Sequence, residues 1–91
     1  MRRIVLFKRK IDAEPQDFQN ALANLQTLNQ RMPGLESWWV AINAGRDGLW
    51  DAALVADFPD EKALRAYEEH PQHVEAGTAV AAVSEFAVFD S

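Results

Sequence analysis

The stretch ALVADFPDEKALRAYEEHPQHV, residues 53–74, passes from a strand into a helix and then across a proline. The apolar residues at its start belong to a predicted strand over 49–58, because aliphatic and aromatic runs bounded by turn residues are typical of strands. Asp60 is a suitable N-cap for a helix over 61–69, and Pro71 interrupts that helix. This stretch therefore places one strand and one helix in the second half of the chain.

The sequence on either side supplies the remaining strands. Toward the C-terminus, HVEAGTAVAAV continues as a second helical piece through residue 83, and SEFAVFD over 84–90 is the last strand. Toward the N-terminus, AGRDG over 44–48 is predicted to be a hairpin loop, and LESWWVAIN over 35–43 is the strand before it. RRIVLFKRK, at the beginning of the chain, is a short apolar run bounded by charge, which indicates a buried strand.

An apolar periodicity between the first two strands predicts another helix. The residues that recur at helical spacing are Phe18, Leu22, Leu25 and Leu28. Pro15 suits the first turn, and we expect the helix to end near Arg31, before a turn at Pro33 and Gly34. The order βαββαβ predicts an α+β, ferredoxin-like domain over residues 1–91, with a four-stranded antiparallel sheet and its helices on one face.

The strands carry apolar residues on both faces, although one face of such a sheet has no helix over it. A solvated face would be polar at every second position. In the first strand, however, Ile4 and Leu6 alternate with the equally apolar Val5 and Phe7. Trp38 and Trp39 are adjacent and therefore point to opposite faces. We expect a second copy of the chain to cover the open face, which gives a homodimer with the two sheets facing each other as an α/β barrel.

The composition narrows the classes of function. The chain has 91 residues, a formal net charge of −5 and no cysteine, so disulfides and thiolate sites are excluded. An acidic domain without a basic patch does not favour nucleic acid as a partner. Without an apolar segment long enough for a membrane span or a signal peptide, no membrane partner is expected and the expected location is cytoplasmic.

Several stretches resemble the stress-responsive dimeric α/β-barrel family, known as Dabb. They are RRIVLFKRK, the PGL turn, the stretch 53–74 with its HPQH, and the closing FAVFD. The resemblance covers nearly the whole chain and implies a ferredoxin-like subunit that dimerises through its open sheet face. One plant member of the family is a polyketide cyclase that performs an intramolecular aldol condensation without a cofactor.

The resemblance implies site residues. The tyrosine and second histidine that carry the chemistry in that cyclase match Tyr67 and His73, and Gly77 matches a glycine downstream. Two positions depart from the family pattern. The histidine usual before the first apolar run is Arg3 here, and a pocket histidine of the cyclase falls near Ala52. The inherited site is therefore partial.

Tyr67 and His73 also form a chemically reasonable pair. Imidazole titrates near neutral pH and suits a general base, whereas a phenol donates a hydrogen bond to a developing enolate. Their spacing of six does not place them on one face of a straight helix, but the break at Pro71 would allow them to converge. Two interpretations remain open: the pair contacts a ligand, or Tyr67 packs on the sheet while His73 begins a helix.

The other candidate residues have competing structural roles. The candidates for lining a binding site are Arg3, Phe7, Trp39, Trp50, His70 and Gly77. Both tryptophans could instead be core or interface residues, and His70, at a helix end before Pro71, favours capping. Gly77 would allow close helix packing or leave room for a ligand. His70 and His73 alone are too few ligands to predict a metal site, and no cofactor is expected.

The sequence thus predicts a small homodimeric barrel protein that binds a small, largely apolar molecule in or beside the barrel. Its enzymatic version is a cofactor-free cyclase or lyase acting on a β-keto substrate, with His73 as base and Tyr67 as hydrogen-bond donor. The alternatives are a non-catalytic stress-response or binding module and a cofactor-independent monooxygenase of a related dimeric-barrel type.

Overall fold

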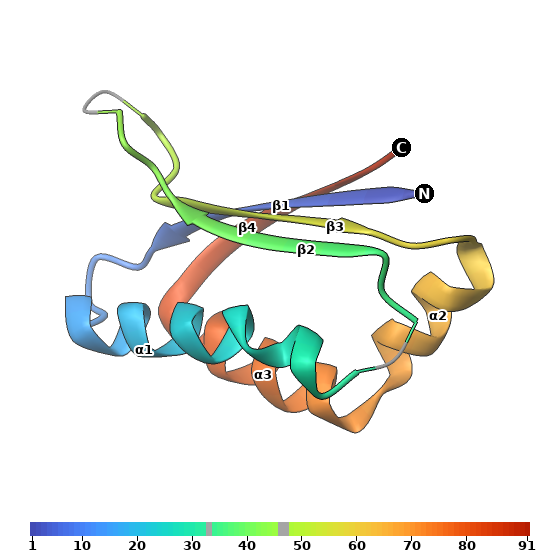
Figure 1. Cartoon of the computed structure of the whole chain (residues 1–91). Helices are drawn as coiled ribbons and strands as arrows, with labels where there is room; N and C mark the ends of the chain where they lie inside the picture. The colour runs from blue at the N-terminus through green and yellow to red at the C-terminus, as the bar shows by residue number, and fades with distance from the viewer. Residues whose placement is uncertain (33, 46–47) are drawn as a thin grey trace.

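A computed structural model describes residues 1–32, 34–45 and 48–91 of the chain. A four-stranded antiparallel sheet forms one layer, and three α-helices lie together beneath it (Figure 1). The strand order β2-β3-β1-β4 and the α+β class confirm the predicted ferredoxin-like arrangement. The elements are β1 (Arg2–Arg9), α1 (Pro15–Gln26), the 3₁₀-helix η1 (Leu28–Gln30), β2 (Ser37–Ile42), β3 (Ala52–Asp57), α2 (Glu61–Glu69), α3 (Pro71–Val83) and β4 (Ser84–Asp90).

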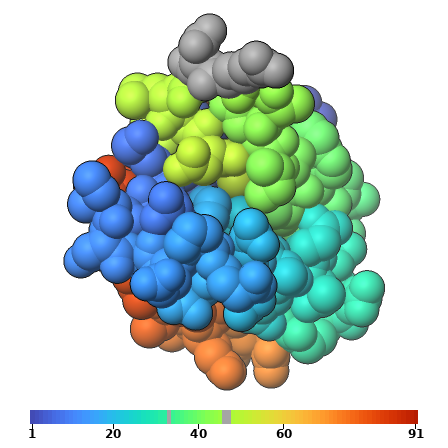
Figure 2. Space-filling view, turned by 90° about the vertical axis from the view of Figure 1, so that its left-hand side faces the viewer, coloured from blue at the N-terminus to red at the C-terminus, as the bar shows by residue number. Residues whose placement is uncertain are grey.

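The sheet has one face toward the helices and one face away from them. Along β1, Val5 and Phe7 are buried against the helices, while Leu6 between them points to the other side. The register of the strands extends this alternation, since Val5 lies opposite Leu54 of β3 and Val88 of β4. The same two layers are visible from the end of the molecule, where α1, in blue to cyan, and α3, in orange, lie below the strands (Figure 2).

The face away from the helices, called here the open face, is mostly apolar. Its apolar residues are Ile4, Leu6, Trp39, Ala41, Ala53, Val55, Ala87 and Phe89. Trp39 is 60% exposed and Phe89 is 63% exposed, which is unusual for large apolar side chains. Trp38 points the other way, is partly buried against the core, and donates a hydrogen bond from Nε1 to the Leu25 carbonyl at 3.1 Å. The prediction that the two tryptophans occupy opposite faces is confirmed.

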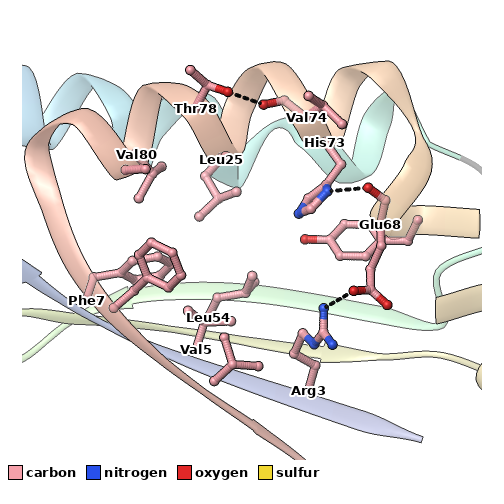
Figure 3. Close-up of a pocket in the computed structure, with 15 residues that line it drawn as sticks. Arg3, Val5, Phe7, Leu25, Leu54, Glu68, His73, Val74, Thr78 and Val80 are labelled. Atoms are coloured by element: carbon pink, nitrogen blue, oxygen red, sulfur yellow. Dashed lines mark hydrogen bonds and ion pairs between the residues drawn. The ribbon is translucent and has the colours of Figure 1, made fainter. Parts of the chain in front are cut away.

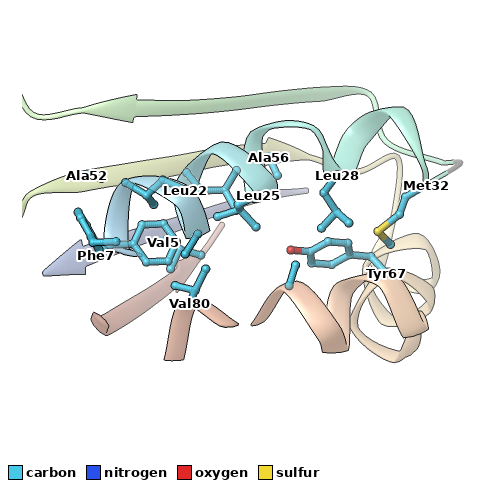
Figure 4. Packing of buried hydrophobic residues seen from close by; sticks show 14 of the residues in the cluster. Val5, Phe7, Leu22, Leu25, Leu28, Met32, Ala52, Ala56, Tyr67 and Val80 are labelled. Atoms are coloured by element: carbon cyan, nitrogen blue, oxygen red, sulfur yellow. The ribbon is translucent and has the colours of Figure 1, made fainter. Parts of the chain in front are cut away.

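The core lies between the helices and the sheet (Figure 4). All four residues of the predicted apolar stripe, Phe18, Leu22, Leu25 and Leu28, are buried. Leu28 is nevertheless in η1 rather than α1, so the predicted end of the helix near Arg31 is wrong. After Gln26 the backbone tightens, with Gln30 N–H bonded to the Thr27 carbonyl and Arg31 N–H bonded to the Leu28 carbonyl. This tighter turn keeps Leu28 directed into the core.

The connection between β2 and β3 also differs from the prediction. β3 begins at Ala52 rather than Leu49, so Trp50 precedes the strand. Backbone pairing continues one residue beyond β2, since Asn43 N–H bonds to the Asp51 carbonyl at 2.9 Å. The Asn43 side chain then accepts a hydrogen bond from Gly45 N–H and donates one to the Trp50 carbonyl, both at 2.7 Å. The central residues of the predicted hairpin loop, Arg46 and Asp47, lie outside the described residues.

The strand before this loop is shorter than predicted, because β2 spans Ser37–Ile42 rather than 35–43. Of the predicted Pro-Gly turn, Pro33 lies outside the described residues, and Gly34 has a φ of +87°, a conformation that glycine adopts at little cost. Among the described helices, none is long and apolar enough to cross a membrane.

Candidate functional site

A cavity of about 400 Å³ lies between the helices and the helix-facing side of the sheet (Figure 3). Its walls come mainly from α3 and from strands β1 and β4. Its lining residues are Arg3, Val5, Phe7, Leu25, Leu54, Tyr67, Glu68, His73, Val74, Gly77, Thr78, Val80, Ala81, Phe86 and Val88. Polar groups gather at one end, where Arg3, Glu68, Tyr67 and His73 lie, and apart from Thr78 the rest of the wall is apolar. The cavity therefore fits a small molecule that is mostly apolar and polar at one end.

Helix α2 places Tyr67 in this cavity. The helix begins at Asp60, whose Oδ1 accepts a hydrogen bond from Ala63 N–H at 2.8 Å, as predicted for an N-cap. Tyr67 follows two turns later and reaches from α2 into the layer between the helices and the sheet (Figure 4). Its ring packs on Phe58, with centroids 5.1 Å apart, and on Trp38, with centroids 5.7 Å apart. The ring is thus fixed on two sides by aromatic neighbours.

The hydroxyl group of Tyr67 remains available to a ligand. It makes no hydrogen bond to another described residue. Every described side-chain oxygen or nitrogen that is sealed from solvent has a hydrogen-bond partner, so the unpaired Tyr67 oxygen is not sealed. The oxygen atom therefore opens on the cavity. Burial raises the pKa of the Tyr67 phenol to about 12, an effect that the positive charge of Arg3 partly opposes. The phenol therefore stays protonated at neutral pH and suits hydrogen-bond donation.

The break between α2 and α3 brings His73 to Tyr67. Helix α2 ends at Glu69, and Pro71 occupies the first turn of α3, where its missing N–H has no helical partner to lose. His70 links the two helices, because its N–H bonds to the Tyr67 carbonyl at 3.2 Å and its Nδ1 accepts from Gln72 N–H at 3.1 Å. Across this bend the rings of Tyr67 and His73 are in contact, with centroids 4.2 Å apart.

His73 is oriented by the backbone of α2. Its Nδ1 lies 3.1 Å from the Glu68 carbonyl oxygen, and the ring is directed from α3 into the cavity (Figure 3). Because a carbonyl oxygen only accepts, this contact is a hydrogen bond when Nδ1 carries the proton. The neutral ring then has its lone pair on Nε2, which makes no hydrogen bond to a described residue. The arrangement leaves Nε2 free to accept a proton from a bound molecule.

Arg3 lies at the polar end of the cavity and is paired with two carboxylates, Asp90 and Glu68, of which Glu68 also lines the cavity. Its Nε and one terminal nitrogen bond to the two oxygens of Asp90 at 2.8 and 2.9 Å, and the other terminal nitrogen lies 3.6 Å from a Glu68 oxygen. The hydrogen bond from Arg3 lowers the pKa of Asp90, so this carboxylate is ionised at neutral pH. Arg3 is therefore an inward-pointing cation that is already paired.

The structure brings five of the eight predicted site residues together around one cavity. Those five are Arg3, Phe7, Tyr67, His73 and Gly77. Trp39 lies on the open face, Trp50 lies near the β2-β3 connection, and His70 is the cap between two helices, so none of the three lines the cavity. A Cβ added to Gly77 would meet nothing within 4 Å, so this glycine does not serve close helix packing. Of its two predicted roles, the remaining one is to leave space in the cavity.

Some lining residues were not predicted from the sequence. Val74, Thr78 and Ala81 recur at spacings of four and three along α3 and share a face with His73 and Gly77, a periodicity that would have identified them. Glu68 was not among the predicted site residues. Its carbonyl and carboxylate meet His73 and Arg3, and no local pattern indicates either contact.

No group of three or more potential metal ligands occurs among residues 1–32, 34–45 and 48–91. The Nδ1 atoms of His70 and His73 each contact a backbone group, the Gln72 N–H and the Glu68 carbonyl. Both contacts lie at the junction of α2 and α3.

A family model described as the stress responsive A/B barrel domain matches residues 1–91. A comparison with curated proteins finds no match. Among solved structures, a dimeric protein of unknown function and ferredoxin-like fold from Bacteroides fragilis is 24% identical, with a TM-score of 0.84, covering 99% of this chain and 92% of that chain.

Two further solved structures have the same fold. A dimeric ferredoxin-like protein of unknown function from Thermobifida fusca is 28% identical, with a TM-score of 0.82, covering 99% of this chain and 89% of that chain. A hydroxynitrile lyase from Passiflora edulis is 15% identical, with a TM-score of 0.77, covering 99% and 93%.

Proposed function

The chain belongs to the family of stress responsive A/B barrel domains, and from this premise we propose that it is a homodimer that binds a small, largely apolar carbonyl compound beneath α3. We further propose that it acts on this compound as a cofactor-free cyclase or lyase. The observation that carries the proposal is the contact between Tyr67 and His73 at the wall of a cavity of about 400 Å³.

The homodimer is supported by the open face. The helices all lie on the other side of the sheet, so a monomer would expose Trp39 and Phe89 to water. Burial of apolar area contributes roughly 25 cal/mol per Å², and a second copy would provide an equally apolar surface. The structures from Bacteroides fragilis and Thermobifida fusca are both described as dimeric. In such a dimer the two sheets would form the barrel, and each cavity would lie beside it, within one subunit.

The proposed chemistry begins with proton abstraction. With a ketone in the cavity, Nε2 of His73 would accept a proton from the carbon next to the carbonyl, and the electron pair of the C–H bond would move into an enolate. The Tyr67 hydroxyl would donate a hydrogen bond to the enolate oxygen. Because the pKa of this phenol is raised to about 12, Tyr67 would stabilise the charge without losing its own proton.

The enolate is common to two balanced reactions. In a cyclase, the enolate carbon attacks a second carbonyl of the same molecule, one C–C bond forms as the C=O π bond breaks, and the new alkoxide takes the proton from His73. In a lyase the steps run backwards: Nε2 of His73 takes the proton of a β-hydroxyl group, the C–C bond breaks as a carbonyl forms, and the released enolate takes the proton back from His73. Neither outcome requires an oxidant, reductant or cofactor. Both need only a base, a hydrogen-bond donor and an apolar cavity that excludes water.

The proposal can be tested without knowledge of the natural substrate. Benzylacetone is a plain ketone with an apolar tail, and exchange of its α-hydrogens for deuterium in D₂O can be followed by NMR. We expect the protein to accelerate this exchange, and His73→Gln and Tyr67→Phe to remove most of the acceleration. His70→Asn is the matched control, since it removes a histidine outside the cavity while asparagine retains N-cap capacity.

Two results would contradict the catalytic proposal. Binding of benzylacetone by calorimetry without accelerated exchange would favour the binding module over the enzyme. Exchange that persists in His73→Gln would assign the base to another residue.

A further inference from the structure

The polar end of the cavity has an unusual balance of charge. Arg3 is the only lysine or arginine among its described lining residues, and its side chain is 14% exposed. An inward-pointing arginine would ordinarily attract a carboxylate or phosphate. Here two carboxylates already face the guanidinium, so the formal charge of the group Arg3, Asp90 and Glu68 is −1.

The pairing cancels charge but does not use all the hydrogen-bond donors of Arg3. A guanidinium has five N–H groups. Two of them point to Asp90, at 2.8 and 2.9 Å, and the terminal nitrogen near Glu68 is 3.6 Å from its oxygen, which is too long for a good hydrogen bond. The cavity thus offers N–H groups that can donate hydrogen bonds to a neutral carbonyl oxygen, in a local field that repels an anion.

The two carboxylates come from distant parts of the chain. Asp90 is the strand partner of Arg3 across the β1-β4 pair. Glu68 extends from α2 toward the guanidinium of Arg3 (Figure 3). Since the two are held by different elements, either can be neutralised while the other is left in place.

We propose that Asp90 and Glu68 make the cavity selective for neutral carbonyl compounds over carboxylates. The two carboxylates offset the positive charge of Arg3, and Arg3 still donates hydrogen bonds to a carbonyl oxygen. This inference rests on the proposed function and concerns the class of molecule that the same cavity accepts.

The test uses methyl hydrocinnamate and hydrocinnamate, which share an apolar tail and differ in the charge of the polar end. Calorimetry at one pH and salt concentration would give both affinities for the wild-type protein, for Asp90→Asn and for Glu68→Gln. We expect the wild type to bind the ester at least about tenfold more tightly than the acid, and each substitution to reduce this ratio about three- to tenfold. Glu61→Gln changes the net charge equally, at the exposed Arg65 pair on α2, and should leave the ratio unchanged.

The outcomes separate the two proposals. Equal affinity of the wild type for ester and acid would overturn the selectivity while leaving ligand binding intact. A strong preference for the ester that neither substitution reduces would overturn the role of the two carboxylates. Failure of both compounds and benzylacetone to bind the wild type would overturn the proposed function, and the selectivity with it. Circular dichroism of the variants would confirm that a lost preference does not reflect unfolding of β4.

Discussion

The imidazole of His73 lies against the ring of Tyr67 across the junction of α2 and α3, with ring centroids 4.2 Å apart and ring planes inclined by 45°. Six residues separate the two in the sequence, so a straight helix would not bring them together. The backbone of α2 orients both, since Tyr67 extends from it and the Glu68 carbonyl faces Nδ1 of His73. This arrangement leaves two atoms for chemistry, the Tyr67 hydroxyl and Nε2 of His73.

Tyr67→Phe should separate chemistry from stability. The hydroxyl group makes no hydrogen bond to a described residue, so its removal should change the free energy of unfolding by less than about 1 kcal/mol, as measured by urea denaturation. Loss of the donor should slow the α-hydrogen exchange of benzylacetone about tenfold or more. Tyr67→Ala would also remove the ring that packs on Phe58 and Trp38, and should cost about 3–5 kcal/mol. A Tyr67→Phe variant as unstable as Tyr67→Ala would show that the hydroxyl is structural.

His70 should affect stability through its cap. Its Nδ1 accepts the Gln72 N–H, one of the unpaired donors at the start of α3, so His70→Ala should destabilise the protein by about 1 kcal/mol in urea denaturation. His70→Asn should retain most of the stability, since asparagine is a favoured N-cap. If the alanine and asparagine variants lose equal stability, the side-chain cap is not the source of the effect.

The sequence was sufficient for the fold because the deciding features are periodic. The stripe that includes Phe18 and Leu22 is buried as predicted, and Pro71 separates two helices as predicted. The apolar residues at alternate positions of β1 also predicted an apolar open face. Each of these features depends on residue type and local spacing, which the sequence displays directly.

The details of the site depend on geometry that spacing does not specify. Whether Tyr67 meets His73 depends on the angle at the His70 junction, and periodicity carries no information about that angle. The pair formed by Arg3 and Asp90 joins residues 87 positions apart, and only the β1-β4 register brings them together. Trp50 belongs to the apolar run but precedes β3, and its carbonyl accepts a hydrogen bond from the Asn43 side chain, a contact that the run itself does not indicate.

Two neighbouring tryptophans provide a matched test of assembly. Trp39 lies on the open face, so Trp39→Asp would place a charge in the proposed dimer interface. By light scattering, we expect this variant to be a monomer of 10.2 kDa and the wild type to have twice this mass. Trp38→Phe alters the helix-facing side of the same strand and should lower stability without changing the mass. A wild-type protein that is monomeric at micromolar concentration would contradict the homodimer and the shared barrel.

Asp57 should make stability depend on pH in the acidic range. Hydrogen bonds from Arg2 first, and from Ser37 second, lower the pKa of this carboxyl to about 2, below the value near 3.8 of an unperturbed aspartate. A carboxyl whose pKa is depressed in the folded protein contributes stability that is fully present above the unfolded pKa and is lost as the pH falls through the folded pKa.

The matching variant is Asp57→Asn, which keeps the size of the side chain but removes its charge. We expect it to be less stable than the wild type at neutral pH, with the difference constant down to about pH 4 and then shrinking toward about pH 2 as Asp57 becomes protonated. Urea denaturation of both proteins across this range would measure the difference at each pH. Because Arg2 and Ser37 flank Asp57 on neighbouring strands, the effect should be on strand pairing. A difference that stays constant through pH 2 would show that the ionised carboxyl of Asp57 is not the source of the stability.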